Sequence, residues 1–124
     1  MPTKSETLGT GAAIKSEGNG DVSRDTIVLA SGNGVLLPGT VLGKITASGK
    51  YKQYTPGAAD GTQNAAGVLY GYHDTTSADQ AAVAIVRQAE VWTARLQWGA
   101  AVVNQGQKDT ATAALLALGV VPRA

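Results

Sequence analysis

The distribution of apolar and polar residues predicts a series of short β-strands along most of the chain. A β-branched, apolar run, TIVLA, covers residues 26–30 and ends in the turn sequence SGNG; runs bounded by turn residues in this way are typical of strands. Similar runs cover residues 40–46, 51–54 and 65–72. Glycines within residues 65–72 favour bends and close backbone approaches, as in a strongly twisted sheet. The pattern therefore predicts a compact, mainly β body.

The stretch LPGTVLGKITASGKY, residues 37–51, has two possible interpretations. In a phosphate-binding loop of the Walker type, four residues separate the two glycines, and the second glycine is followed by Lys and then Ser or Thr. Here three residues separate Gly39 from Gly43, and Lys44 is followed by Ile45. We therefore interpret the stretch as a Pro-Gly turn, a strand and a second tight turn that leads into the next strand.

Residues 78–98 carry two competing periodicities. One set of residues recurs at helical spacing, and another alternates as in a strand. The helical set is Ile85, Ala89, Trp92 and Leu96. The alternating set is Val83, Ile85, Arg87, Ala89 and Val91. Even with β-branched residues at its centre, the pattern alone slightly favours a helix over a strand, whereas the short strands around it favour a long β segment, which we predict.

Residues 108–118, KDTATAALLAL, predict one short C-terminal helix. Asp109 or Thr110 is the expected N-cap, because a short polar side chain accepts hydrogen bonds from the free N–H groups of a first helical turn. Gly119 is the expected end of the helix. The sequence Val-Val-Pro at residues 120–122 then predicts a tail strand.

The first 22 residues contain few large apolar side chains. Apart from Met1, these are Leu8, Ile14 and Val22. Such a segment buries too little apolar surface to offset an ordering cost of about 1–2 kcal/mol per residue. We therefore expect a flexible N-terminal arm, residues 1–22, followed by one β-rich domain, residues 23–124. The residues alone leave open whether the arm has no role or becomes ordered on a partner, for example by adding a strand to a sheet edge.

Composition narrows the possible partners. The 124 residues fit one domain, and 44% of them are hydrophobic, but with no Phe the core must consist of Val, Leu, Ile and Ala. A core this thin would gain from association with other copies of the chain. The formal charge of +1 and the scattered basic residues argue against nucleic-acid binding. Zero Cys excludes thiolate metal sites, and no apolar run approaches the ~20 residues of a membrane span.

No arrangement of residues indicates an enzyme, a metal site or a cofactor. His73 is the single imidazole, and a catalytic role would need Ser77 and either Asp74 or Asp79 to converge on it. Residues of these types are also typical of an exposed turn, which is the interpretation we favour. The sequence DGTQN at residues 60–64 lacks the repeated carboxylates of a calcium loop and predicts an Asp-Gly turn.

Taken in order, these segments resemble the head decoration proteins of tailed bacteriophages, the lambda-like group. The resemblance covers nearly the whole chain from about residue 17 onward. It is carried by residues 23–25, 37–45, 65–70, 82–87 and 89–91, by Leu96 with Trp98, and by the Ala-rich helix that closes at residues 118–120. The chain departs from the family in the arm, which shows little match, and at Gly99, where relatives often have Pro.

The resemblance implies a β-clip-like compact barrel of short strands, with one short C-terminal helix and the flexible arm. It also implies a homotrimer on the outer surface of the expanded icosahedral head, at three-fold and quasi-three-fold positions, that reinforces the shell against the pressure of the packaged DNA. The implied partners are other copies of the chain and the major capsid protein, on which the arm becomes ordered. No cofactor, nucleic acid or membrane is implied.

Two sets of candidate residues follow. The residues expected to contact the capsid are Thr3, Lys4, Leu8, Ile14, Ser16 and Arg24. The residues expected in the core or at trimer contacts are Val41, Leu42, Leu69, Ile85, Trp92 and Trp98. Deletion of residues 1–16 is expected to leave a folded trimer that no longer coats capsids. The alternative is a small carbohydrate-binding module in which the tryptophans and tyrosines stack on sugars.

Overall fold

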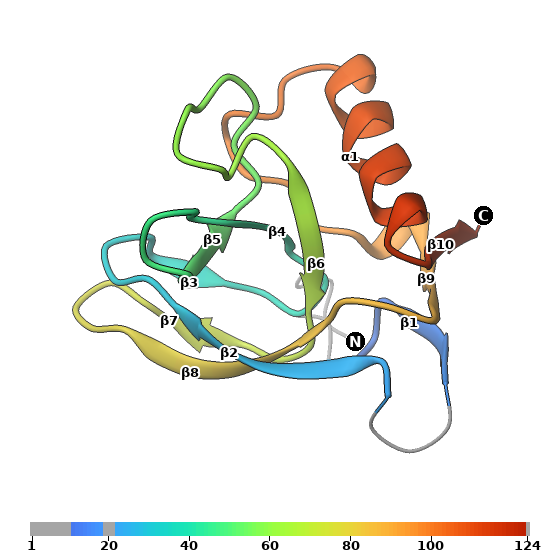
Figure 1. The fold of residues 1–124 in the computed structure, drawn as a ribbon, viewed down its shortest axis with the longest axis horizontal. Helices are drawn as coiled ribbons and strands as arrows, with labels where there is room; N and C mark the ends of the chain where they lie inside the picture. Colours follow the sequence, from blue (N-terminus) through green and yellow to red (C-terminus); the bar gives the residue numbers. More distant parts are fainter. Residues whose placement is uncertain (1–10, 19–21, 124) are drawn as a thin grey trace, which may run out of the picture.

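Short strands dominate the computed structural model, which describes residues 11–18 and 22–123. The described residues form a closed five-stranded barrel, a three-stranded sheet beside it and one α-helix (Figure 1). In chain order the elements are β1 (Ile14–Glu17), β2 (Arg24–Leu29), β3 (Val35–Leu36), β4 (Val41–Lys44), β5 (Tyr51–Gln53), β6 (Ala65–Leu69), β7 (His73–Asp74), β8 (Gln80–Ile85), β9 (Ala89–Trp92), the 3-10 helix η1 (Thr93–Arg95), α1 (Gln105–Ala117) and β10 (Val120–Arg123). The predicted mainly β body with one short C-terminal helix is confirmed.

The barrel contains β2, β5, β4, β6 and β8 in that order. Its longest pairing joins β2 to β8, which run antiparallel over six residue pairs. A parallel pair between Leu29 and Tyr51 joins β2 to β5. The fully buried side chains inside the barrel are aliphatic, as the absence of Phe requires. They include Leu29, Leu36, Leu42 and Leu69.

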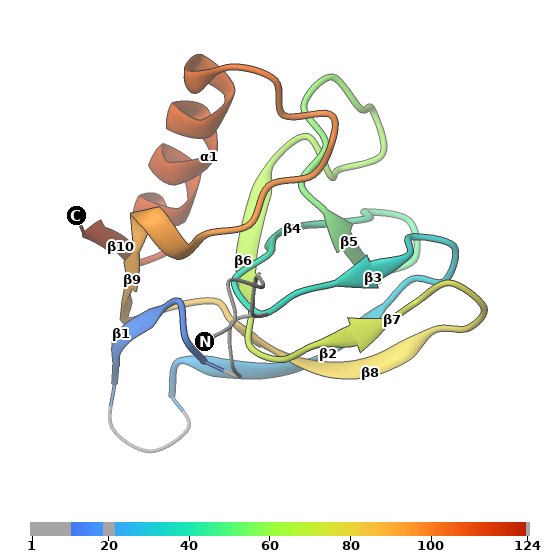
Figure 2. The same cartoon turned by 180° about the vertical axis from the view of Figure 1, so that it is seen from behind.

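The three-stranded sheet has the order β1-β9-β10, and α1 packs against β10 and against β6 of the barrel (Figures 1 and 2). On the central strand β9, β1 pairs antiparallel on one side and β10 pairs parallel on the other. A second core fills the space between this sheet, α1 and the barrel. Ala111 and Leu115, four residues apart on one face of α1, are fully buried there with Val91 and Val120. A third, two-stranded sheet joins β3 to β7.

Residues 78–98 contain strands, as favoured above, but they form two strands in different sheets instead of one long segment. β8 belongs to the barrel and β9 to the three-stranded sheet. Between them the chain turns at Gln88, whose φ of 48° lies in the left-handed region. The hydroxyl of Ser23 donates a hydrogen bond of 2.8 Å to the Gln88 carbonyl and so helps to hold this turn. Ile85 before the turn and Ala89 and Val91 after it are all buried at odd-numbered positions, which is why the sequence pattern shows no break.

The C-terminal helix begins three residues earlier than predicted. Asn104 is its N-cap, and its side chain accepts a hydrogen bond of 2.9 Å from the Gln107 N–H. The predicted caps Asp109 and Thr110 lie inside the helix, where the Thr110 hydroxyl donates to the Gly106 carbonyl. Gly119 ends the helix as predicted, with a φ of 92°. The spacing of Asn104 and Gln107 resembles a capping box and is the signal that would have identified the true start.

The folded body begins earlier than the boundary expected at residue 23. Residues 14–17 form β1, which pairs with β9, and Ala13 is fully buried. The partner strand lies far along the sequence, so local composition gave no sign of this pairing. A deletion of residues 1–16 would remove most of β1 as well as the arm. Residues 1–10, with Thr3, Lys4 and Leu8, lie outside the described residues.

Two glycines of the stretch 37–51 sit where another backbone segment comes close. Gly39, in the predicted Pro-Gly turn, has a φ of 92°, and a Cβ on it would lie 2.7 Å from the Arg95 carbonyl oxygen. A Cβ on Gly43, in β4, would lie 2.6 Å from the Cα of Thr62. The stretch forms β4, a turn and the start of β5, as predicted, and its glycines allow packing instead of holding phosphates.

The predicted Asp-Gly turn at residues 60–64 is the segment that packs on β4. The Asp60 carboxylate accepts hydrogen bonds from the Thr62 hydroxyl at 2.6 Å and the Thr62 N–H at 3.0 Å. These bonds, with Lys52 at 3.2 Å, lower the pKa of Asp60 to about 2. Gly61 follows with a φ of 109°, and a Cβ on it would collide with the Lys44 carbonyl oxygen and the Thr46 hydroxyl.

Substitution of Gly61 tests this close approach, and Gly57 provides a matched control. Both glycines have positive φ, but a Cβ on Gly57 would have nothing within 4 Å. Gly57→Ala should lower the free energy of unfolding by the ~1–2 kcal/mol of left-handed strain. Gly61→Ala should lower it by roughly 1–3 kcal/mol more, because it also overpacks the turn against β4. Urea denaturation of both variants measures the difference, and equal losses would contradict the packing.

Candidate assembly surface

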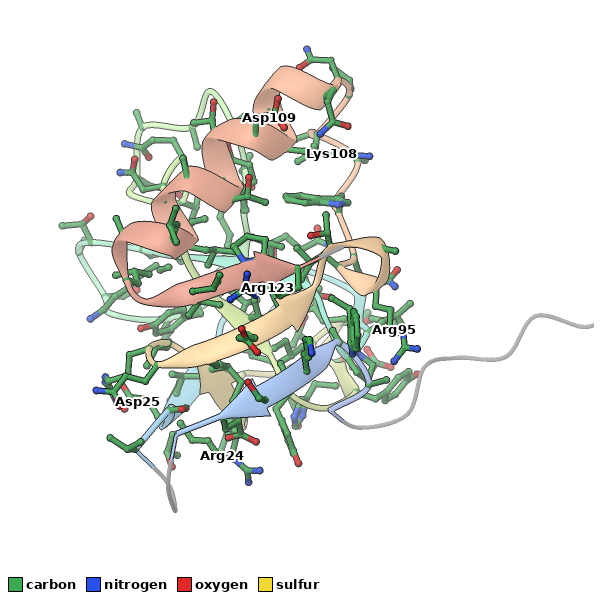
Figure 3. The ribbon with its side chains drawn as sticks, turned by 90° about the vertical axis from the view of Figure 1, so that its right-hand side faces the viewer. Arg24, Asp25, Arg95, Lys108, Asp109 and Arg123 are labelled. Atoms are coloured by element: carbon green, nitrogen blue, oxygen red, sulfur yellow. The ribbon has the colours of Figure 1, made fainter. Side chains whose placement is uncertain are left out.

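The outer face of the β1-β9-β10 sheet is open and carries polar and aromatic side chains. Ala89 and Val91 of β9 point into the core, so Glu90 and Trp92 point outward. Glu90 pairs in register with Ser16 on β1 and accepts a hydrogen bond of 3.0 Å from its hydroxyl. On the other side Glu90 accepts one of 2.7 Å from Arg123 of β10. Figure 3 looks onto this face, with α1 above it.

Trp92 lies among basic side chains on this face. The Nζ of Lys15 is 5.0 Å from the centre of the Trp92 ring, and the guanidinium carbon of Arg95 is 5.5 Å from it. Both distances suit cation–π attraction. Arg95 also donates a hydrogen bond of 3.0 Å to the Ala12 carbonyl, so η1 holds the start of the described chain.

A hollow of about 330 Å³ lies next to this sheet, between η1, α1 and β10. Its apolar lining comes from Ala94, Leu96, Trp98 and Pro122. Lys108 of α1 lies at its rim, with the ammonium group 6.0 Å from the centre of the Trp98 ring. The other edge of Trp98 meets Tyr54 in a T-shaped contact. We call the outer face of β1-β9-β10, η1 and this hollow the assembly surface.

The described basic side chains fall into two classes, those that form ion pairs and those that lie over an aromatic ring without one. Five basic side chains form ion pairs, and among the described residues four do not. Each of these four lies over an aromatic ring. They are Lys15 and Arg95 over Trp92, Lys44 over Tyr51, and Lys108 over Trp98. Three of the four therefore belong to the assembly surface.

An ion pair fixes the point where β1 meets the barrel. Arg24 of β2 donates two hydrogen bonds, of 2.8 and 3.0 Å, to the Glu17 carboxylate and one of 3.1 Å to the Tyr70 hydroxyl. The hydrogen bonds from Arg24 hold the pKa of Glu17 below its ordinary value. The guanidinium of Arg24 also lies 4.3 Å from the centre of the Tyr70 ring. The side chain of Arg24, predicted to contact the capsid, is thus engaged within the body.

A family model described as bacteriophage lambda head decoration protein D matches residues 3–120. The chain belongs to this family. No curated protein matches the chain. The resemblance found in the sequence is therefore confirmed, and it extends over residues 3–120. Membership implies a phage capsid decoration protein, located with the virion capsid, and the family is one of structural proteins not known as enzymes.

For this decoration-family chain, the structure divides the candidate trimer and core residues into two groups. Val41, Leu42, Leu69 and Ile85 have at most 2% of their surface exposed, so they have no area left for a subunit contact. Trp92 and Trp98 are half-buried and lie on the assembly surface. Of the candidate arm residues, Ile14 and Ser16 lie in β1: Ser16 belongs to the assembly surface, whereas Ile14 packs against the core.

Sequence reasoning missed the three basic residues of the assembly surface that lack ion pairs. Trp92 directly precedes η1 and Arg95 is its last residue, and this helical spacing was visible in the sequence. Lys15 and Lys108, in contrast, approach their tryptophans from distant elements. Only the pairing of β1 with β9 and the position of α1 bring them together.

The two carboxylates that could orient a catalytic His73, Asp74 and Asp79, form other contacts. Asp74 accepts hydrogen bonds from Thr76, and Asp79 binds Lys50 and the Ser31 N–H. His73 itself lies in β7, a two-residue strand paired with β3, where a turn was expected.

Within residues 11–18 and 22–123 no three His, Asp or Glu side chains gather as a metal site requires. No helix in the same residues is long and apolar enough to cross a membrane.

Glu17→Gln tests the ion pair at the root of β1 through its pH dependence. Because the folded state lowers the pKa of Glu17, its stabilising effect is complete above the ordinary value of 4.5 and is lost as pH falls through the lowered pKa. The variant should be less stable than the parent at pH 7, by about 0.5–1 kcal/mol, and the difference should shrink at pH 3. Urea denaturation at several pH values measures it. In an Arg24→Gln background the same substitution should have little effect, whereas an unchanged effect there would contradict the pairing.

Proposed function

We propose that the chain acts as a homotrimer that binds the exterior of the expanded phage head at three-fold and quasi-three-fold positions and stabilises the shell against the pressure of the DNA. The family match over residues 3–120 is the observation that carries this proposal. The structure supports it with an open surface at the root of the N-terminal arm and a small aliphatic core.

The proposed mechanism is multivalent docking of the arms on the major capsid protein. Ordering ten residues opposes binding by roughly 1–2 kcal/mol per residue, so one arm alone binds weakly. On a rigid trimer, docking of the first arm makes the later contacts intramolecular and raises their effective concentration. A trimer that touches neighbouring capsid subunits binds only the assembled shell and so stabilises it by mass action.

Exposed apolar side chains on the barrel, like the small core, would gain from burial in a trimer. Apolar side chains on β2 and β3 and before β7 are exposed to solvent. They are Val28 (42% exposed), Val35 (46%) and Tyr72 (53%). Burial of such side chains between subunits would add apolar contact that one copy of the chain lacks.

The alternative function, sugar binding by the tryptophans, gains no support from the site. Lys15 and Arg95 lie over the Trp92 ring and Lys108 lies over the Trp98 ring. These cations occupy the π-faces on which a sugar ring would stack.

Removal of residues 1–10 tests the proposed role of the arm without removing β1. A chain beginning at Gly11 should remain folded and trimeric but should no longer coat expanded shells, because the docking segment is missing. Co-sedimentation with undecorated expanded shells measures coating, and analytical ultracentrifugation of the free protein measures the trimer. A variant with residues 1–10 replaced by ten Gly and Ser residues separates arm sequence from arm length. Full coating by either variant would refute the role of the arm.

A further inference from the structure

The assembly surface holds the net charge of the described residues. It carries four basic side chains, Lys15, Arg95, Lys108 and Arg123, and two acidic ones, Glu90 and Asp109. The remaining described residues have five basic and five acidic side chains, which cancel. The excess positive charge therefore lies on one side of the molecule, where the described chain begins (Figure 3).

This charge is available to a partner. Lys15, Arg95 and Lys108 lie over tryptophan rings, which hold the side chains in place but do not neutralise them. A cation already held in position loses less side-chain freedom when an anion binds to it. The surface is thus suited to carboxylates.

The hollow beside these cations suits an apolar side chain. Ala94, Leu96, Trp98 and Pro122 form the apolar part of its lining, and the polar part comes from Thr93, Gln105, Lys108, Asp109 and Thr112. At about 330 Å³ it falls at the lower end of the range for ligand pockets. An occupant that places an apolar residue here sets its neighbouring residues within reach of the basic side chains.

We propose that the assembly surface binds an acidic segment of the capsid protein, with one apolar side chain of that segment in the hollow between η1 and α1. This inference rests on the proposed function. Arg95 holds the Ala12 carbonyl, so the described chain begins beside this surface. Ten extended residues span at most about 35 Å, so an arm docked on the shell keeps the surface close to the shell.

A second copy of the chain fits this surface less well than the capsid protein. Among the described acidic side chains, five form ion pairs and only Asp74 and Asp109 do not. Asp109 belongs to the assembly surface itself, so Asp74 is the one carboxylate without an ion pair that the described residues of a neighbouring copy can offer. Nucleic acid fits less well too, because a net charge of two positive groups is small compared with the several phosphate contacts that such binding uses.

The segment binds through side chains instead of extending the sheet at β10. The Ala89 N–H donates a hydrogen bond to the Gly119 carbonyl. In the parallel ladder the backbone N–H and C=O groups of Val121 and Arg123 therefore point toward β9, whereas the backbone groups of Val120 and Pro122 point toward the free edge of the sheet. Proline has no N–H to donate, and proline at an edge blocks the addition of a strand.

Lys108→Gln and Lys44→Gln form a matched pair for the test. Both lysines lack an ion pair and lie at a similar distance from a ring centre, 6.0 Å and 5.9 Å, and both substitutions remove one charge. Only Lys108 belongs to the assembly surface. Circular dichroism and ultracentrifugation first establish that each variant is folded and has the oligomeric state of the parent.

Binding to undecorated expanded shells is then measured by co-sedimentation at 50 to 500 mM salt. Lys108→Gln should bind about three- to tenfold more weakly than the parent at low salt, because each trimer loses three contacts, and the difference should shrink as salt screens the charges. Lys15→Gln should behave in the same way. Lys44→Gln should stay within about twofold of the parent at every salt concentration.

The outcomes separate this inference from the proposed function. A parent protein that leaves shells bare at every salt concentration overturns both. A parent that coats shells, with Lys108→Gln and Lys44→Gln equal to it, overturns the inference alone. Loss of the oligomer in Lys108→Gln but not in Lys44→Gln would show that the surface joins copies of the chain. Tighter binding of the parent to a DNA oligonucleotide than to shells would show that the surface binds nucleic acid. Either result overturns the inference.

Discussion

The pairing of both ends of the described chain with β9 is the constraint on which the rest of the structure depends. β9 follows directly from the barrel, takes β1 on one side and β10 on the other, and fully buries Val91 between them and α1. Without β1 the start of the described chain would have no fixed place, and without β10 the helix would have no anchor after Gly119. One four-residue strand therefore places the start of the chain, the helix and the tail on the same side of the barrel.

The same sheet decides where charge can remain unpaired. Elsewhere on the described surface every basic side chain except Lys44 meets a carboxylate, as Arg87 meets Asp25 and Lys50 meets Asp79. On the assembly surface, tryptophan rings take the place of most of the carboxylates. An ion pair cancels the field of a cation, whereas an aromatic ring attracts it without cancelling it. A protein with almost no net charge thus keeps a basic region, which its overall composition conceals.

An aliphatic core divided between two clusters also explains the distribution of glycine. Because Tyr51 and Tyr54 are the only buried aromatic side chains among the described residues, the backbone segments themselves approach closely, as at Gly43 against Thr62 and Gly61 against Lys44. Close backbone packing of this kind requires residues without a Cβ at the points of contact. The glycine-rich stretch that superficially resembles a phosphate loop is therefore a consequence of how the barrel is packed.

The sequence by itself determined the strand runs of β2, β4, β5 and β6, the turn at Asp60, the end of the helix at Gly119 and the family, because strand propensity, turn chemistry and helix termination are properties of a few neighbouring residues. Tertiary structure alone decided that residues 14–17 are a strand, that β8 and β9 lie in different sheets, and that Lys15 and Lys108 lie over tryptophans. These features depend on contacts between segments far apart in the chain, whose free energy comes from the surface they bury together. No local pattern records that quantity, which is why the composition of the first 22 residues suggested an arm where part of a sheet begins.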